Sequence, residues 1–160
     1  MPDYEVRVTP SLLDRLLDTD PKTSRDVVPS RAETVRDLKR AVQRDLEILL
    51  NSRNPYGDLP TAFVEAGQSV LTYGLPDFSA LNVASPADQN RLRQMIENTI
   101  RLFEPRLVGV AAMLQPAGET ERSLRLRLEA RLVMDPAPEA VSFDIVMPMT
   151  TLKYEVSEPS

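Results

Sequence analysis

Two stretches of the chain repeat apolar residues every three or four positions, which is the period of an amphipathic helix. The first begins at a capping box, Ser30-Arg31-Ala32-Glu33, and is predicted to end near Asn51. The second has Ser85 as its N-cap and is predicted to end near Glu104, because the residue before Pro105 is pushed out of helical geometry. The apolar stripes of these helices are Val35, Leu38, Val42, Leu46 and Leu49, and Leu92, Ile96, Ile100 and Phe103.

A shorter helical pattern precedes these two helices. An apolar face of leucines follows Ser11 and stops before Pro21, and the polar, proline-bounded run 21–29 predicts a linker. The leucine face either packs on the protein's own core or fits a groove on a partner, and both interpretations stay open. The leucines are Leu12, Leu13, Leu16 and Leu17.

The C-terminal third follows the two-residue period of β-strands instead. Segment 107–114 is apolar on both faces and is predicted to be a covered central strand. Segments 124–134 and 141–147 alternate apolar and polar residues, so each is predicted to bury one face. Short turns join the three strands, which predicts an antiparallel meander, and 152–156 is predicted to add a short edge strand.

Helices first and strands last predict an α+β domain in which the helices pack on one face of a small antiparallel sheet. Between the two long helices lies an irregular connection with one predicted short strand, 69–73, which turn residues 74–77 end. We expect three segments: an N-terminal helix and linker (1–29), the α+β domain (30–150) and a C-terminal tail (151–160).

The composition limits which kinds of catalytic and metal-binding site the chain can form. The 160 residues include no Cys and no His, which excludes disulfides, thiolate nucleophiles, imidazole bases and the common zinc, copper and haem ligand sets other than carboxylates. We expect no metal, no cofactor and no catalytic residue. The net charge of −5 argues against general binding to nucleic acid. Residues 1–9 lack the pattern of a signal peptide and no segment is apolar enough to span a membrane, so we expect a cytoplasmic protein without membrane insertion.

The charges are distributed unevenly along the chain. No Lys or Arg occurs from Asn54 to Asn90, whereas arginines cluster from Arg91 to Arg131. This segregation is typical either of a protein that docks different faces on different partners or of a solvated surface with chance clustering.

The candidate binding site is Glu104-Pro105-Arg106, where the second long helix meets the first strand. A carboxylate at a helix C-terminus opposes the helix dipole, so a cation is expected to compensate Glu104, and Arg106 is the nearest. In an extended segment residues i and i+2 point the same way, so the two side chains can pair. The pair either closes the junction internally or orients a contact with a partner.

Glycoside hydrolysis is the one enzymatic class that needs neither His nor Cys, and Glu104 is the carboxylate to test. A neighbouring arginine stabilises the ionised form of an acid, which is the opposite of what a general acid requires. The residues therefore argue against an enzyme.

Four motifs occur in order along the chain: Ser11-Leu12-Leu13-Asp14-Arg15-Leu16, Arg44-Asp45-Leu46-Glu47 leading to Leu49-Leu50-Asn51, Tyr73-Gly74-Leu75-Pro76-Asp77 and Glu104-Pro105-Arg106-Leu107. Together they resemble the TssE family of type VI secretion, which is similar to the baseplate wedge protein of contractile-tailed phages. One departure is Ile48, where the family pattern leads us to expect an aromatic residue.

The resemblance implies a non-enzymatic baseplate subunit that joins wedge proteins (TssF, TssG and TssK) and starts polymerisation of the contractile sheath (TssB and TssC). It also implies a domain similar to the interlocking domain of the sheath protein, which offers its sheet to extended sheath arms. Glu104, Pro105 and Arg106 are then expected to contact these partners. Two other readings are a lysozyme-like peptidoglycan hydrolase, a label some relatives carry, and a small regulatory adaptor.

Overall fold

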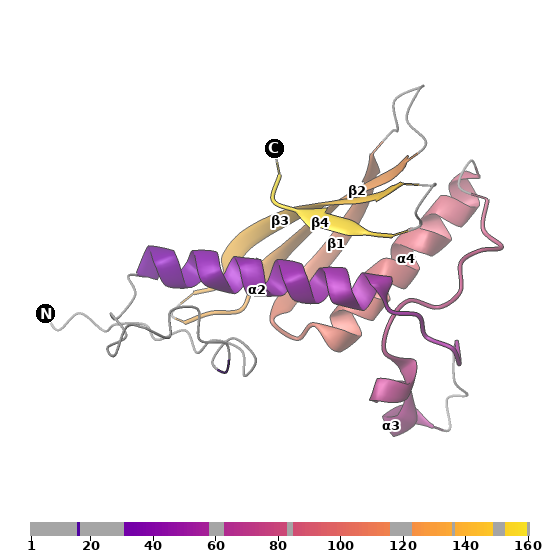
Figure 1. Cartoon of the computed structure of the whole chain (residues 1–160), viewed down its shortest axis with the longest axis horizontal. Coiled ribbons are helices and arrows are strands. Elements are labelled where there is room, and N and C mark those ends of the chain that lie inside the picture. Colours follow the sequence, from indigo (N-terminus) through magenta and orange to yellow (C-terminus); the bar gives the residue numbers. More distant parts are fainter. Residues whose placement is uncertain are drawn as a thin grey trace, which may run out of the picture.

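The fold is α+β, with two long helices packed on one face of an antiparallel sheet, as predicted (Figure 1). The computed structural model describes residues 16, 31–57, 63–82, 85–115, 123–135, 137–148 and 153–159. The elements are α2 (Arg31–Asn51), α3 (Val64–Gly67), the 3-10 helix η1 (Val70–Thr72), α4 (Pro86–Phe103), β1 (Leu107–Gln115), β2 (Ser123–Leu132), β3 (Glu139–Pro148) and β4 (Glu155–Ser157).

Helix α2 ends at Asn51, as its pattern predicts, and turns its apolar stripe to the sheet. Val42 and Leu46 are fully buried at the middle of that stripe. The predicted cap at Ser30, the linker and most of the N-terminal leucine helix lie outside the described residues. Within that leucine helix Leu16 alone is described; it is helical and 72% exposed.

Helix α4 has the predicted bounds. Ser85 precedes it with extended backbone, and its carbonyl, rather than its hydroxyl, accepts a hydrogen bond from Gln89 N–H at 2.9 Å. The helix stops after Phe103, because Pro105 has no N–H and keeps Glu104 out of the helical region (φ −123°, ψ 76°).

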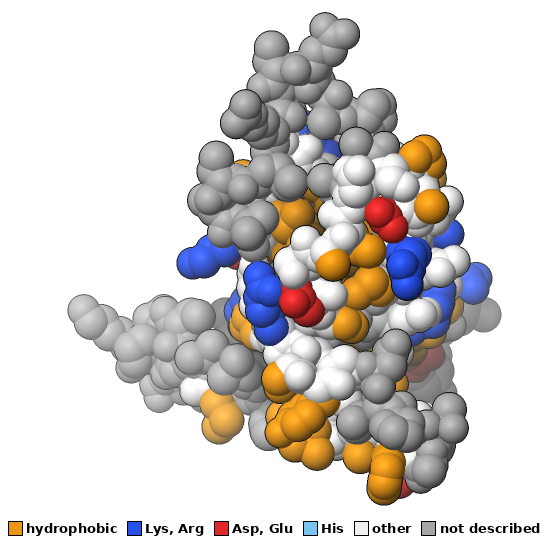
Figure 2. Space-filling model, turned by 90° about the vertical axis from the view of Figure 1, so that its right-hand side faces the viewer, with side chains coloured by type: hydrophobic (Ala, Val, Ile, Leu, Met, Phe, Trp, Pro, Cys, Tyr) orange, Lys and Arg blue, Asp and Glu red, His pale blue; other side chains and the backbone are white. Residues whose placement is uncertain are grey.

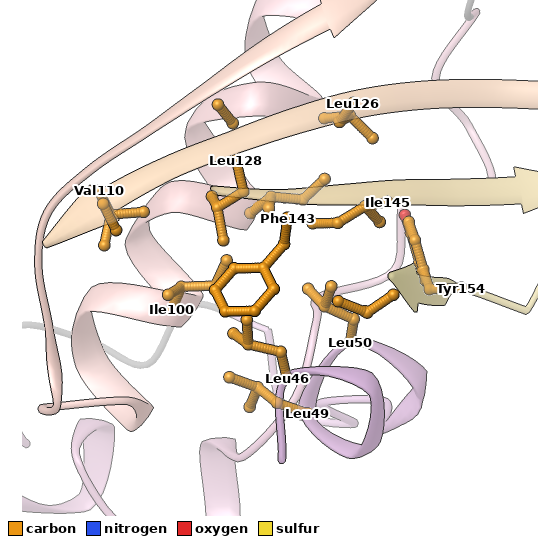
Figure 3. Packing of buried hydrophobic residues seen from close by; sticks show 14 of the residues in the cluster. Leu46, Leu49, Leu50, Ile100, Val110, Leu126, Leu128, Phe143, Ile145 and Tyr154 are labelled. Atoms are coloured by element: carbon orange, nitrogen blue, oxygen red, sulfur yellow. The ribbon is translucent and has the colours of Figure 1, made fainter. Parts of the chain in front are cut away.

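The four strands form one antiparallel sheet in the order β1-β2-β3-β4, which confirms the meander. In β2 and β3 every second side chain points at the helices, and Leu128 lies opposite Phe143 in the ladder. Figure 3 shows the Phe143 ring between Ile100 of α4 and Leu46 of α2, at the centre of the core. Both helices therefore bury their stripes against the same sheet face.

The prediction that 107–114 is a central strand is wrong. β1 lies at an edge and, among the described strands, pairs with β2 alone. Leu107 and Val110 are buried, but Val108 and Met113 on the other face are 38% and 45% exposed. An apolar strand is typical of a covered position, yet here α4 packs on one face while the other stays open.

The predicted strand at 69–73 is also wrong, since η1 occupies this segment. The Ser69 hydroxyl accepts a hydrogen bond from Leu71 N–H at 3.3 Å, which favours a local turn over a strand. Val70 and Leu71 are 85% and 50% exposed, so no sheet covers their apolar side chains. Without a partner strand, β-propensity alone does not form a strand.

The C-terminal edge strand exists, as β4, but it spans Glu155–Ser157 and not the predicted 152–156. Residues 149–152 lie outside the described part of the chain. Just before β4, Tyr154 is 2% exposed and packs into the core. Asn51, the last residue of α2, pairs with it as a strand would: Tyr154 N–H donates to Asn51 Oδ1 and Asn51 Nδ2 donates to Tyr154 O, both at 2.8 Å. The end of the chain is thereby joined to α2.

Gly74 allows the connection between α2 and α4 to pack closely against the end of α2. Leu75 forms two backbone hydrogen bonds of 2.9 Å there, from its N–H to Ser52 O and from Asn54 N–H to its carbonyl. Gly74 has φ +108°, and a Cβ there would lie 2.4 Å from Ser52 O. Only glycine fits this turn.

Gly74→Ala is therefore expected to lower the free energy of unfolding by about 2 kcal/mol or more, since it adds both a clash and a strained φ. Gly67→Ala is the matched control, because a Cβ there meets no atom within 4 Å. Urea unfolding of both variants measures the difference. Equal loss in the two would contradict the role given to Gly74.

The burial of the Tyr154 phenol predicts that the free energy of unfolding falls at alkaline pH. Burial raises the pKa of its phenol, with a smaller opposing effect from Arg53, and its hydroxyl has no hydrogen-bond partner among the described residues. In the unfolded chain the phenol loses its proton near pH 10, so the stability is intact below about pH 10 and falls above it. Tyr154→Phe is expected to stay within about 1 kcal/mol of wild type at pH 7 and to lose less at pH 11 in urea unfolding. An identical alkaline loss in both proteins would refute this assignment.

Candidate protein-binding site at the Glu104–Arg106 junction

The junction is a tight turn between α4 and β1. Glu104 N–H closes the last turn of α4 by donating to Ile100 O at 2.8 Å, and Leu107 N–H donates to Glu104 O at 3.1 Å. The carbonyl of Arg106 accepts from Val133 N–H at 2.7 Å, next to the end of β2. The backbone thus places Glu104 in the protein interior and Arg106 directly before the first strand of the sheet.

Glu104 and Arg106 pair with each other within the chain. A contact of this pair with a partner stays a prediction. Arg106 Nε donates to Glu104 Oε1 at 2.6 Å, and Arg106 Nη2 binds Glu104 Oε2. Both carboxylate oxygens are therefore engaged in a bidentate pair, and Glu104 is only 4% exposed. The two side chains pair as predicted, but Pro105 and Arg106 form a turn and not the extended segment on which that prediction relied.

A third side chain, which the sequence reasoning did not connect to this pair, is Asp45 of α2. Arg106 Nη2 donates to Asp45 Oδ2 at 2.7 Å, and Arg44 Nη2 donates to Asp45 Oδ1 at 3.0 Å. The Arg44-Asp45 motif was visible in the sequence, but its contact with Arg106 joins residues 61 positions apart. The resulting network (Arg44, Asp45, Glu104 and Arg106) ties α2 to the junction.

The two acids of this network raise the pKa of Arg106 and of the nearby Tyr73. The hydrogen bond to Glu104 raises the pKa of Arg106 most, burial opposes the rise, and the bond to Asp45 adds to it. Tyr73 lies against the junction, with its ring 5.3 Å from that of Phe103 in an edge-on contact. Burial, and then the negative charges of Asp45 and Glu104, raise the pKa of Tyr73. Arg106 is therefore a permanent cation held between two acids.

This geometry does not suit catalysis by Glu104. A general acid must present an oxygen to its substrate, and both oxygens of Glu104 face Arg106 inside the protein. Within the described ranges, no three acidic side chains gather as a metal site would require. The lysozyme-like reading therefore finds no support at this carboxylate.

A groove lies beside the junction, between α4 and the connection that carries α3 and η1. Phe103 and Gly74 line it near the junction, and Tyr56, Phe63 and Leu102 add partly exposed apolar surface. Figure 2 shows apolar side chains gathered on this side of the molecule. Exposed apolar surface of this kind is typical of protein contacts.

The chain thus forms a small α+β domain in which the charged junction joins α2, α4 and β1. The exposed apolar groove beside it suits protein binding. The chain belongs to the baseplate wedge protein gp25 family, whose sequence model matches residues 36–137. A structural role in a phage-tail-like baseplate follows from this membership. Among curated proteins no match is found. No described helix is long and apolar enough to cross a membrane.

The network predicts unequal effects for two acids of α2. Asp45→Ala removes the bridge between α2 and Arg106 and is expected to lower the free energy of unfolding by about 1–3 kcal/mol. Asp37→Ala, on the exposed side of the same helix, is expected to change it by less than about 0.5 kcal/mol. Urea unfolding of both variants checks this, and similar values for the two would argue against the bridge.

Proposed function

We propose that this protein is a TssE-type subunit of a type VI secretion baseplate, which connects wedge proteins to the contractile sheath on the cytoplasmic side and starts sheath polymerisation. The family match over 36–137 carries the baseplate role. The finer assignment rests on the motifs at 11–16, 44–51, 73–77 and 104–107. TssF, TssG and TssK are the proposed wedge partners, and TssB and TssC are the proposed sheath partners.

The Glu104–Arg106 junction supports contact with the wedge. Arg106 keeps 26% of its side chain exposed, although Glu104 and Asp45 hold its orientation. An arginine fixed in this way loses little conformational entropy when a partner binds. Its charge is partly compensated inside the protein, so we assign much of the contact area to the adjacent groove.

An open stretch of sheet edge supports contact with the sheath. Ladder hydrogen bonds alternate sides, so the N–H and C=O of Ser142 point to the same side as those of Asp144, which is the side of β4. β4 ends at Ser157, opposite Asp144. Continued register would put Pro159 opposite Ser142, and proline has no N–H to donate.

The stretch of β3 before Asp144 therefore faces no described strand. A groove runs beside it, between β3 and the N-terminal half of α2, and the Lys39–Glu139 ion pair (2.9 Å) lies along it. Val35 and Glu158 also line this groove. An extended arm from another protein fits here by strand addition, with main-chain hydrogen bonds providing the affinity.

Ser142→Pro tests the proposal. This variant removes the outward N–H of β3 without removing a bond of the β2–β3 ladder, and Ser142→Ala, which keeps the N–H, is the control. In co-purification we expect Ser142→Pro to lose TssB and TssC, Ser142→Ala to retain them, and both to retain TssF and TssG.

Failure of the wild-type protein to bind wedge or sheath proteins would refute the secretion-system role. Recovery of one partner from outside the baseplate would favour a regulatory adaptor instead. Loss of sheath proteins in both Ser142 variants would move the contact away from this edge.

A further inference from the structure

β1 is an unusual strand to find at a sheet edge. Its nine residues, Leu107 to Gln115, include no charged residue and no proline. Val108 and Met113 expose apolar side chains on its open face. Such a strand is a template for pairing with another chain. Edge strands are normally protected by a charge, a proline or a bulge of their own, and of these β1 has only a register irregularity between Val108 and Ala111.

Side chains of helix α4 bind outward-facing backbone groups of β1. Ala112 N–H points outward from the sheet and donates to Glu97 Oε1 at 2.8 Å, in a buried contact. Nearby, Arg101 Nη2 donates to Val110 O at 3.4 Å. One outward donor and one outward acceptor of β1 are thus occupied by side chains of α4.

Glu97 is held firmly in this position. It is 7% exposed, and the same oxygen that binds Ala112 accepts from Arg93 Nη1 at 2.7 Å. Its other oxygen lies 3.6 Å from Arg101 Nη2. The carboxylate therefore stands where the carbonyl of a neighbouring strand would stand.

We propose that Glu97 is an edge guard, which prevents a second copy of this chain from pairing with β1. Two β1 edges are self-complementary in an antiparallel, two-fold arrangement, so a second copy is the occupant that an opened edge would take. The stretch of β3 before Asp144, by contrast, has no such side chain among the described contacts. This inference does not depend on the secretion-system role.

Glu97→Ala tests the guard by sedimentation velocity on the full chain. Wild type is expected to be a monomer, and the variant a concentration-dependent dimer of twice the mass. Adding Ala112→Pro, which removes the outward N–H, is expected to restore the monomer. Glu47→Ala, an exposed glutamate of α2, is the control and stays monomeric. A folded Glu97→Ala monomer, or a dimer that survives Ala112→Pro, would overturn the proposal.

Two further measurements test the proposal even if the Glu97→Ala variant does not fold. Glu97→Gln keeps an oxygen for Ala112 N–H and is expected to stay monomeric, so a dimer would refute the guard. In the wild-type protein, the Ala112 amide is expected to exchange its hydrogen about tenfold or more slowly than the outward amide of Leu114. Equal exchange rates at the two amides would equally refute it.

Discussion

The bidentate pair between Arg106 and Glu104 is the interaction on which the arrangement of this domain depends. Pro105 ends α4 and turns the chain, and the pair then holds that turn closed. Because Arg106 also binds Asp45, the same guanidinium fixes α2 relative to the first strand. A carboxylate buried to this degree is tolerable only with such a partner, which ties the local turn to the packing of both helices.

The helices do more than cover one face of the sheet. Polar side chains from α4 bind the outer edge of β1, and those from α2 bind the outer edge of β4, where Gln43 Nε2 donates to Val156 O at 2.7 Å. Unpaired backbone groups at an edge invite association, so these bonds restrict where another chain can add. The stretch of β3 before Asp144, beside the α2 groove, faces no described strand.

Local patterns were sufficient for most elements. The bounds of α2 and α4 and the alternation in β2 and β3 follow from period and from stop residues such as Pro105. The prediction of a strand at 69–73 was wrong, because strand propensity needs a partner strand and the Ser69 hydroxyl stabilises a local turn there instead. The pairing of Glu104 with Arg106 was one of two alternatives that i, i+2 spacing allowed.

The sequence by itself determined the α+β class, the helix stops, the strand alternation and the absence of His and Cys chemistry, because these depend on residues near each other in the chain. Tertiary structure alone decided that β1 lies at an edge, that Asp45 meets Arg106, and that Glu97 meets Ala112. Apolarity on both faces of a strand does not reveal whether its neighbour is a strand, a helix or solvent. Contacts between distant residues depend on how whole elements pack, and no local period encodes that.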